Sequence, residues 1–380
     1  MTNNILKQFI SVLALLGSMF ICFDAMAVIN CSPSLAYPAQ TQTVTLSGVF
    51  YAGNDLPVGS VIYRSTIKGP GHTGIQCDSA FSVPRYFSVS TEPSGQSFAF
   101  GNSPYTGEIY PTNTPGIGIA LWYSGKTFTK KAPLLRDDYY LDHAGSYGVT
   151  PTIDISLIKT GVVDSGSIVN GISIPTIIMY AGVKEGYSGL PITTLTINFS
   201  GSINFITQTC QTPDVNVPMG SYEVSEYFRR VGSTTPWIDS SIQLSNCPTF
   251  TGYHDHDNHQ TVEGSGTPSG NSVATNLLKV SLQPLSNFID EGNGVFAVNS
   301  ASGGGEATGI GLQLGYTPDV NASPTTPTTI WKHGDTWNVT PPNNGTANFR
   351  IPLAARYYQT SQVVTPGPAD GKVIFTINYQ

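Results

Sequence analysis

Short apolar stretches bounded by Gly, Pro, Asn and Ser recur along this 380-residue chain. Strands of that length, separated by turn residues, are typical of an all-β sandwich. No stretch has the sustained apolar spacing of a long amphipathic helix. The predicted strands include 43–51, 59–67, 116–123, 152–159, 193–199 and 203–207.

The composition favours an all-β fold and excludes two classes of partner. Charged residues make up 11% of the chain, whereas it contains 40 Gly and 27 Pro. Exposed helix faces need more Glu, Lys and Ala, while strands and tight turns do not. The net charge is −7 and basic residues never exceed a pair (Lys130-Lys131, Arg229-Arg230), so we expect no binding to nucleic acid or to anionic membranes.

The first 27 residues have the features of a secretory signal. Lys7 supplies a positive start, residues 9–23 are apolar, and Ala25-Met26-Ala27 is a small-residue cleavage pattern. The apolar run is too short to span a bilayer comfortably, and no second long run follows. We therefore expect a signal peptide at 1–27 and an exported chain that starts at Val28. An uncleaved anchor is the alternative.

Cysteine usage agrees with export. Cys22 lies within the signal, and Cys31, Cys77, Cys210 and Cys247 remain. An even number in an exported chain indicates disulfides. Of the three possible pairings we favour Cys31–Cys77 with Cys210–Cys247, because each half of the chain would then be a self-contained folding unit. A zinc site is the rival, but no pair has close C-x-x-C spacing.

A repeated motif suggests two related sandwiches in tandem. Residues 116–121 have the sequence G-I-G-I-A-L and residues 309–314 have G-I-G-L-Q-L. Each motif is a glycine-marked entry into a predicted buried strand, although a chance match is the alternative. We place the domain boundary near Ser200-Gly201. We expect the polar stretches 251–271 and 316–329 to be exposed loops of the second domain.

Residues 372–380 form a predicted strand in which Val373, Phe375, Ile377 and Tyr379 share one face. The sequence stops directly after this strand, so its outer edge has no evident partner. Long apolar edges are a hazard unless they are covered. Either this strand closes a complete sandwich, or the sandwich lacks one strand and is completed by a strand from another chain.

Several segments of the second half belong together. They are an apolar strand leading to Cys210, the second cysteine Cys247, the segments 307–314, 354–358 and 365–369, and the penultimate Tyr379. With these, residues 201–380 resemble the pilin domain of chaperone–usher fimbriae. The resemblance implies an incomplete fold whose terminal strand pairs with a strand of a periplasmic chaperone. Basic residues of the chaperone would hold the carboxylate of Gln380, and the next subunit's N-terminal extension would later replace the chaperone strand.

The start of the expected mature chain bears on its place in a fibre. A polymerising pilin carries a donor strand of roughly ten or more alternating residues before its first cysteine. This chain has Val28, Ile29 and Asn30 between the signal and Cys31. The resemblance therefore implies a subunit that accepts a strand but donates none, which places it at the end of a fibre.

The first domain has its own set of matching segments, at 55–62, 77–78, 115–118 and 154–160. With these, residues 28–200 resemble the receptor-binding domain of type 3 fimbrial adhesins, and more distantly the type 1 mannose-binding adhesin. The resemblance implies binding to host surface glycans or to matrix proteins such as collagen. The loops between the segments match poorly, and ligand identity is set by loops.

One polar–aromatic cluster of the first domain is a candidate ligand site. Sugar sites use planar apolar faces beside a few oriented polar groups. The alternative is a solvated loop followed by a strand with packed tyrosines. For the neighbouring Trp122-Tyr123 we favour core packing over ligand contact. The candidate residues are Arg136, Asp137, Asp138, Tyr139, Tyr140, Asp142 and His143.

The run from Tyr253 to His259 contains imidazole and carboxylate groups, which can bind zinc or copper. We favour the alternative of a flexible polar loop, because such a loop offers no rigid scaffold to fix a metal's ligands. We expect neither a metal nor another cofactor.

Motifs of catalysis are missing from the sequence. It has no G-x-S-x-G turn, phosphate loop or dinucleotide fingerprint. Paired carboxylates of a glycosidase are set by space rather than by order, so a secreted carbohydrate-active enzyme stays an alternative. The two resemblances together imply a non-enzymatic fimbrial tip adhesin with two tandem immunoglobulin-like sandwiches. It would reach the cell surface through the periplasm with a chaperone and an outer-membrane usher. A structural tip subunit or adaptor without a host receptor is the other alternative.

Overall fold

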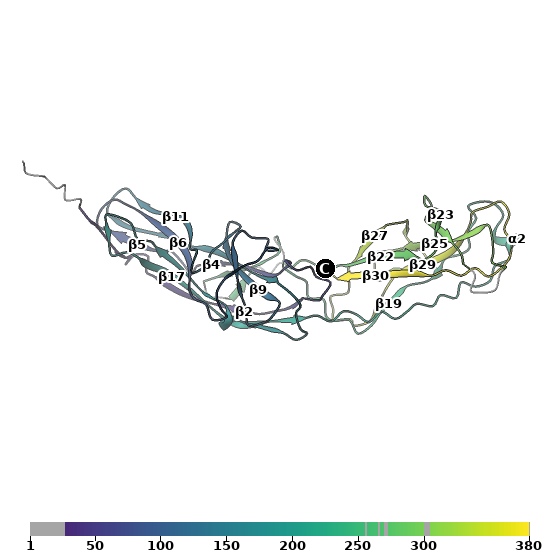
Figure 1. Cartoon of the computed structure of the whole chain (residues 1–380), viewed down its shortest axis with the longest axis horizontal. Coiled ribbons are helices and arrows are strands. Elements are labelled where there is room, and N and C mark those ends of the chain that lie inside the picture. Colours follow the sequence, from purple (N-terminus) through teal and green to yellow (C-terminus); the bar gives the residue numbers. More distant parts are fainter. Residues whose placement is uncertain (1–26, 255–256, 265–266, 270–272, 300–304, 380) are drawn as a thin grey trace, which may run out of the picture.

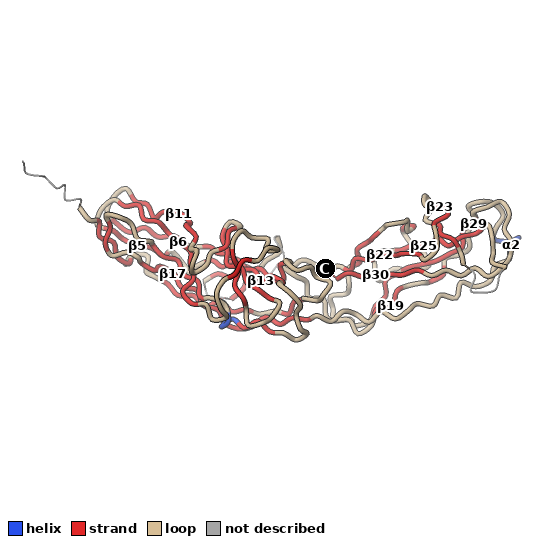
Figure 2. Tube along the Cα trace, in the orientation of Figure 1, coloured by secondary structure: helices blue, strands red, loops and turns tan. Residues whose placement is uncertain are grey.

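The computed structural model describes residues 27–254, 257–264, 267–269, 273–299 and 305–379. Figure 1 shows an elongated molecule in which two β-rich bodies lie end to end. We call residues 29–206 the first sandwich and residues 210–379 the second sandwich. The predicted all-β fold is confirmed, because strands and loops make up nearly all of the chain (Figure 2). The helical elements of the described part are η1 (Gly171–Ser173) and α2 (Val224–Tyr227).

One sheet of the first sandwich has the strand order β4-β13-β9-β8-β7, and β10 also pairs with β9. Its central strands β9 and β13 are buried along nearly their whole length. Their runs of Ile, Leu and Ala suit strands that are covered on both faces. The strands are β4 (Val61–Lys68), β7 (Phe98–Ala99), β8 (Glu108–Pro111), β9 (Ile117–Tyr123), β10 (Lys126–Thr127) and β13 (Thr152–Lys159).

The other sheet of the first sandwich has the order β11-β6-β15-β17, and β17 also pairs with β2, β3 and β14. Strand β2 runs parallel to β17, from Gln40 opposite Leu195 to Leu46 opposite Gly201. The two predicted strands at 193–199 and 203–207 are therefore one long strand, and the expected boundary at Ser200-Gly201 falls inside it. The strands are β2 (Gln40–Leu46), β3 (Val49–Tyr51), β6 (Phe81–Thr91), β11 (Leu134–Leu141), β14 (Ile168–Asn170), β15 (Thr176–Ala181) and β17 (Ile192–Ile206).

The end of the first sandwich that lies away from the second is closed by a small sheet of order β12-β5-β1-β16. The Cys31–Cys77 disulfide joins β1 to β5 in this sheet. A separate apolar cluster around Ile75, Val83 and Tyr139 lies beneath it. The strands are β1 (Ile29–Pro33), β5 (Thr73–Cys77), β12 (Gly145–Val149) and β16 (Tyr187–Ser188).

The second sandwich pairs a sheet of order β18-β29-β25-β24-β23 with a sheet of order β27-β22-β30. Strand β26 adds to β25, and β19 pairs with β28. The Cys210–Cys247 disulfide lies in this sandwich, so both bridges have the short-range pairing. The strands are β18 (Ile238–Asp239), β19 (Ile242–Leu244), β22 (Leu278–Pro284), β23 (Phe288–Asp290), β24 (Val295–Ala297), β25 (Ile310–Tyr316), β26 (Thr329–Ile330), β27 (Thr336–Val339), β28 (Phe349–Ile351), β29 (Leu353–Gln359) and β30 (Val373–Tyr379).

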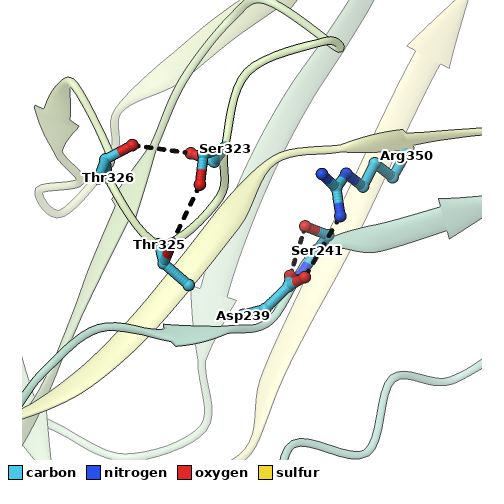
Figure 3. Close-up of polar contacts among 6 residues, drawn as sticks. All are labelled: Asp239, Ser241, Ser323, Thr325, Thr326 and Arg350. Atoms are coloured by element: carbon cyan, nitrogen blue, oxygen red, sulfur yellow. Dashed lines mark hydrogen bonds and ion pairs between the residues drawn. The ribbon is translucent and has the colours of Figure 1, made fainter.

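A cluster of hydrogen bonds lies where the chain passes from β18, which pairs with β29, to β19, which pairs with β28 (Figure 3). The carboxylate of Asp239 accepts hydrogen bonds from the backbone N–H and the hydroxyl of Ser241, at 2.9 and 2.6 Å. Its other oxygen lies 3.4 Å from Nη1 of Arg350 on β28. These bonds hold the bend between β18 and β19, so that the two consecutive strands can pair with different partners.

The repeated glycine motif occupies the same position in the two sandwiches. It leads into β9 in the first and β25 in the second, with φ of 79° at Gly116 and 76° at Gly309. A Cβ at Gly116 would lie 2.1 Å from the backbone oxygen of Val162, and one at Gly309 would lie 2.2 Å from that of Val363. Both positions therefore require glycine. The registers also agree, because Ile117 faces Lys159 and Ile310 faces Gln359.

Strand pairing extends this correspondence to nearly the whole of each sandwich. The order β4-β13-β9-β8-β7 matches β18-β29-β25-β24-β23, and β11-β6-β15 matches β27-β22-β30. The pairs β10·β9 and β26·β25 match as well. Strand β30 thus corresponds to β15. In the first sandwich β15 pairs with β17 on its other side, and no strand of the described second sandwich takes that place beside β30.

We expected the stretch 251–271 to be an exposed loop of the second domain, but its described residues do not form one. Residues 260–263 form β20 (Gln260–Glu263), which pairs with β4 of the first sandwich, and β21 (Thr267–Ser269) pairs with β20. The prediction failed because polar composition alone cannot show that a hairpin completes a sheet in another part of the molecule. Among the described residues, no helix is long and apolar enough to cross a membrane.

Candidate functional site

An open groove runs along β30 in the second sandwich. Its volume is about 1210 Å³, and its walls come from both sheets and from the stretch 214–222. Val373, Phe375 and Ile377 of β30 point inward but stay half-exposed, whereas the inward residues of β15 are fully buried. The groove is therefore a gap in the core of the second sandwich rather than a surface dent.

The side chains at the groove floor are slightly more exposed than those at the matching positions of the first sandwich. Ile310 is 8% exposed and Leu312 is 7% exposed, while Ile117 and Ile119 at the matching positions are 2% and 0% exposed. The floor also includes Leu282, Phe296 and Ala355. Apolar side chains that line an open groove favour a partner that brings apolar side chains of its own.

The edge of β30 that faces the groove carries free backbone groups. Alternate residues of an antiparallel strand direct their N–H and C=O groups toward opposite neighbours. The N–H of Tyr379 points away from β22, because it donates to Asp55 of the first sandwich at 2.8 Å. By alternation, Val373, Phe375 and Ile377 direct their amides into the groove. These groups match the backbone of an added strand.

The opposite wall of the groove is irregular backbone. Residues 214–222 contain no strand, and a bridge between Gln211 and Ser245 holds the chain just before them. In the first sandwich the early strand β2 pairs directly with β17. At the matching place the second sandwich has strand β30 on one side of the groove and irregular backbone on the other.

The end of β30 is anchored beneath the second disulfide. The Tyr379 hydroxyl accepts a hydrogen bond of 2.9 Å from the backbone N–H of Cys210, and its ring stacks with Phe250. Burial raises the pKa of Tyr379, and the nearby Asp55 carboxylate raises it further. Tyr379 therefore stays neutral at physiological pH. Of the predicted edge residues, Val373, Phe375 and Ile377 line the open edge, Tyr379 is buried at its end, and Gln380 lies outside the described residues.

The predicted ligand cluster of the first sandwich divides into parts with different surroundings. Tyr139 is fully buried, and its hydroxyl lies 3.1 Å from that of Thr194. Asp137 accepts a hydrogen bond of 2.6 Å from Nε of the buried Arg85 and lies 3.5 Å from Arg136. These residues hold β11 to β6, and packing explains their presence without a ligand.

The remaining members of the cluster face solvent. Asp138 accepts a hydrogen bond of 3.1 Å from Ser82, and Tyr140 is 62% exposed. Asp142 and His143 lie just past β11, with their side chains 2.7 Å apart and largely exposed. The hydrogen bond from His143 lowers the pKa of Asp142. Asp138 and Tyr140 share the outer face of the sheet, whereas Asp142 and His143 lie at its far end.

The sequence analysis missed two tyrosines on that outer face. Tyr86 on β6 and Tyr180 on β15 are direct cross-strand neighbours, and their rings stack with centroids 5.4 Å apart. A Cβ at Gly182 would lie 2.6 Å from the Tyr86 ring, so glycine makes room for the ring to lie over the backbone. The signal was available, because alternation in β6 puts Pro84 and Tyr86 where polar residues are expected. We call Pro84, Tyr86, Leu135, Tyr140 and Tyr180 the tyrosine face.

One residue in each of the other two sites considered from sequence is buried. Trp122 is buried, and its indole N–H donates to Ser156 at 3.1 Å, which confirms core packing. His254 is also buried, between the rings of Phe50 and Tyr63. Residues 255 and 256 of the predicted polar loop lie outside the described part. Within the described part, no group of three His, Cys, Asp or Glu residues could hold a metal.

Comparisons with known proteins place the chain in a family. A family model described as fimbrial protein matches residues 197–380. The fimbrial-like protein YraH of Escherichia coli K12 is 30% identical over 197 residues, which cover 48% of this chain and 87% of that protein.

Two solved structures resemble the chain at low similarity. The CupB6 tip adhesin of Pseudomonas aeruginosa has a TM-score of 0.32 and 15% identity, covering 92% of this chain and 94% of that one. The receptor-binding domain of adhesin MrkD1P of Klebsiella pneumoniae has a TM-score of 0.31 and 20% identity, covering 48% of this chain and 98% of that one. Both scores lie below 0.5, so the assignment rests on the sequence matches. By those matches, the chain belongs to the fimbrial protein family.

Proposed function

We propose that this fimbrial subunit is a tip adhesin of the chaperone–usher type. Its first sandwich binds a host surface glycan or a matrix protein such as collagen. Its second sandwich is an incomplete pilin fold that accepts a strand from a partner. The observation that carries the proposal is the open edge of β30 above the groove, because it needs a strand that the described chain does not supply.

The groove supports acceptance of an extended strand rather than of a compact ligand. It is bordered by a free strand edge on one side and by apolar side chains along its floor. An added strand would satisfy the amides of Val373, Phe375 and Ile377 while alternate side chains fill the floor. A periplasmic chaperone would supply this strand first, and the next fimbrial subunit would replace it at the outer-membrane usher.

The position of β1 supports a place at the fimbrial tip. Residues 29–33 pair with β5 and β16, and the Cys31–Cys77 disulfide holds them there. A strand fixed in this way cannot leave to fill the groove of a neighbour. The proposed path is export with removal of the signal 1–27, passage through the periplasm, and display at the tip.

The tyrosine face supports receptor binding by the first sandwich. Outer faces of antiparallel sheets are usually polar, so Pro84, Tyr86 and Tyr180 on one such face are unusual. Flat rings beside a carboxylate and hydroxyl groups are the chemistry that sugar rings bind. Asp138 and Ser82 supply those polar groups next to the rings.

Strand acceptance is tested by expressing the full chain with and without the periplasmic chaperone of its own fimbrial system. We expect a stable one-to-one complex with the chaperone, and aggregation or degradation without it, because the groove exposes core residues. A full chain that is monomeric and stable alone, and that binds no donor peptide, would contradict the missing strand.

Receptor binding is tested with the chaperone complex of the full chain on a panel of glycans and collagens. Saturable binding that survives moderate salt supports the adhesin. No binding from a folded complex favours the second candidate, a structural tip subunit or adaptor. Release of product from a glycan would instead favour a carbohydrate-active enzyme.

A further inference from the structure

The hairpin β20–β21 belongs to the second half of the chain but lies in a sheet of the first sandwich. Strand β20 runs parallel to β4, with Gln260 opposite Ser65 and Glu263 opposite Lys68. Strand β21 covers the other side of β20. The main sheet of the first sandwich therefore ends in two strands that come from beyond its own last strand, β17.

The two arms of this hairpin start from the core of the second sandwich, which contains Phe250 and Leu278, and they are bonded to each other at the base. Tyr253 and Ala274 exchange two backbone hydrogen bonds of 3.1 and 2.9 Å. The N–H of Gly252 donates to the side chain of Asn276 at 2.6 Å. The hairpin thus spans the joint, with its base in one sandwich and its tip in the other.

The contact with the first sandwich is part of the core rather than a surface touch. Val262 is fully buried within the apolar core of the first sandwich. The hydroxyl of Tyr63 donates to Oε1 of Gln260 at 3.0 Å, and both side chains are buried. The ion pair between Lys68 and Glu263 spans 2.8 Å, but both groups are half-exposed, so it contributes little.

The hairpin also covers an edge that would otherwise be open. Without β20, strand β4 would be the edge of the sheet, and its backbone groups along residues 65–68 would be unpaired on that side. Such an edge invites pairing with other chains. In the second sandwich the corresponding strand β18 is much shorter and has no such cover in the described part.

We propose that the second sandwich completes the first by donating this hairpin to its sheet. The first sandwich is then fully folded when the joint between the two is formed, and the two sandwiches act as one stiff unit. This inference goes beyond the proposed function, because it holds whether or not the chain binds a host receptor. It also implies that residues 28–200 alone are an incomplete folding unit.

A destabilising variant tests the proposal in the full chain held by its chaperone. Val262→Ala removes core contacts of the hairpin, and Val273→Ala is the matched control in the same loop, since Val273 is 40% exposed. We expect amide hydrogen exchange in β4 to rise about tenfold or more in V262A. Exchange in β25 and in the control stays unchanged. Unchanged exchange in β4 of V262A would overturn the proposal.

A crosslink provides a test that does not rely on destabilisation. Thr66 and Thr261 are register partners on β4 and β20. We expect the Thr66→Cys, Thr261→Cys double variant to form a disulfide in high yield, and the pair Thr66→Cys, Val273→Cys to form none. Absence of the first crosslink in a folded full chain would show that the hairpin is not seated on β4, while leaving strand acceptance by the groove untouched.

Discussion

The two sandwiches share a strand order and a glycine motif but differ in how their cores are closed. In the first, β17 follows β15 and pairs with β2, so the sheet continues to the first strands of the domain. In the second, β30 holds the position of β15, and beyond it lies the groove. A single strand thus distinguishes the closed first sandwich from the second sandwich, which has an open groove.

The exposed fractions of matching residues on β15 and β30 show how much a strand beside them buries. Inward residues of β15 such as Ile177 and Met179 have 0% exposure, whereas Phe375 and Ile377 of β30 are half-exposed. Burying one such side chain contributes about 1.5–3 kcal/mol. A strand inserted into the groove would therefore supply a large share of the stability of the second sandwich, whereas β17 already holds this position in the first sandwich.

The largest expected effect comes from placing a charge inside the groove. Phe375→Asp puts a carboxylate where the inserted strand would bury it, which costs several kcal/mol. Thr376→Asp is the matched control, because Thr376 is exposed on the same strand and does not line the groove. We expect F375D to lose chaperone capture at least a hundredfold, and T376D to keep it, as measured by co-purification of the full chain. Equal capture of both variants would show that the groove is not the binding site.

Removing each disulfide in turn tests whether the first sandwich has a larger free energy of unfolding than the second sandwich with its groove empty. The bridges close loops of similar length, 46 and 37 residues in sequence separation, so each contributes about 4 kcal/mol in the chain-entropy view. We expect the C31S/C77S variant to keep the first sandwich folded. The C210S/C247S variant unfolds the second sandwich unless a donor strand fills the groove.

The measurement is urea unfolding of the full chain with the groove empty and with it filled by a donor peptide. The two variants serve as controls for each other. If the second sandwich tolerated the loss of its bridge with the groove empty, the difference in stability inferred from exposure would be incorrect.

Local patterns allowed much of this architecture to be predicted. Alternation predicted the strands, and the pattern of Val373, Phe375 and Ile377 indicated the open edge. Both features depend on residues that are neighbours in sequence. The Gly116 and Gly309 motifs were informative because close backbone approach excludes any other residue there.

The misses share one physical cause, which is contact between distant segments. Val262 is buried because β4 lies beside it, and nothing in the polar sequence around it shows this. The tyrosine face arises from cross-strand pairing of Tyr86 with Tyr180, which lie far apart in the chain. Within the predicted ligand cluster, sequence could not show that Tyr139 points inward while Tyr140 points outward in a strand that contains a bulge.

A smaller effect, on receptor binding, is expected from variants of the tyrosine face, which lies in the first sandwich and away from the groove. Tyr86→Ser and Tyr180→Ser remove the stacked rings from the outer surface, so we expect receptor binding to fall about tenfold. Stability should change by less than about 1 kcal/mol, since both side chains are partly exposed. Leu35→Ser is the control, because Leu35 is 88% exposed at another part of the first sandwich. Equal binding by all three variants would move the receptor site elsewhere, with Asp142 and His143 the next candidates.

The smallest expected effect is a response of the joint to alkaline pH. Burial raises the pKa of Tyr63 from its ordinary value of 10.0 to about 12, and its hydroxyl donates to Gln260 of the hairpin. A raised pKa means that the folded state holds this proton more tightly than the unfolded state. The contribution of the protonated Tyr63 to the free energy of unfolding is therefore fully present below pH 10 and is lost as the pH rises through about 12. We expect crosslinking between positions 66 and 261 to weaken over this range in the full chain, and Tyr63→Phe to abolish that dependence. A pH response that persists in Y63F would assign it to another tyrosine of the joint, such as Tyr51 or Tyr379, whose pKa values are also raised.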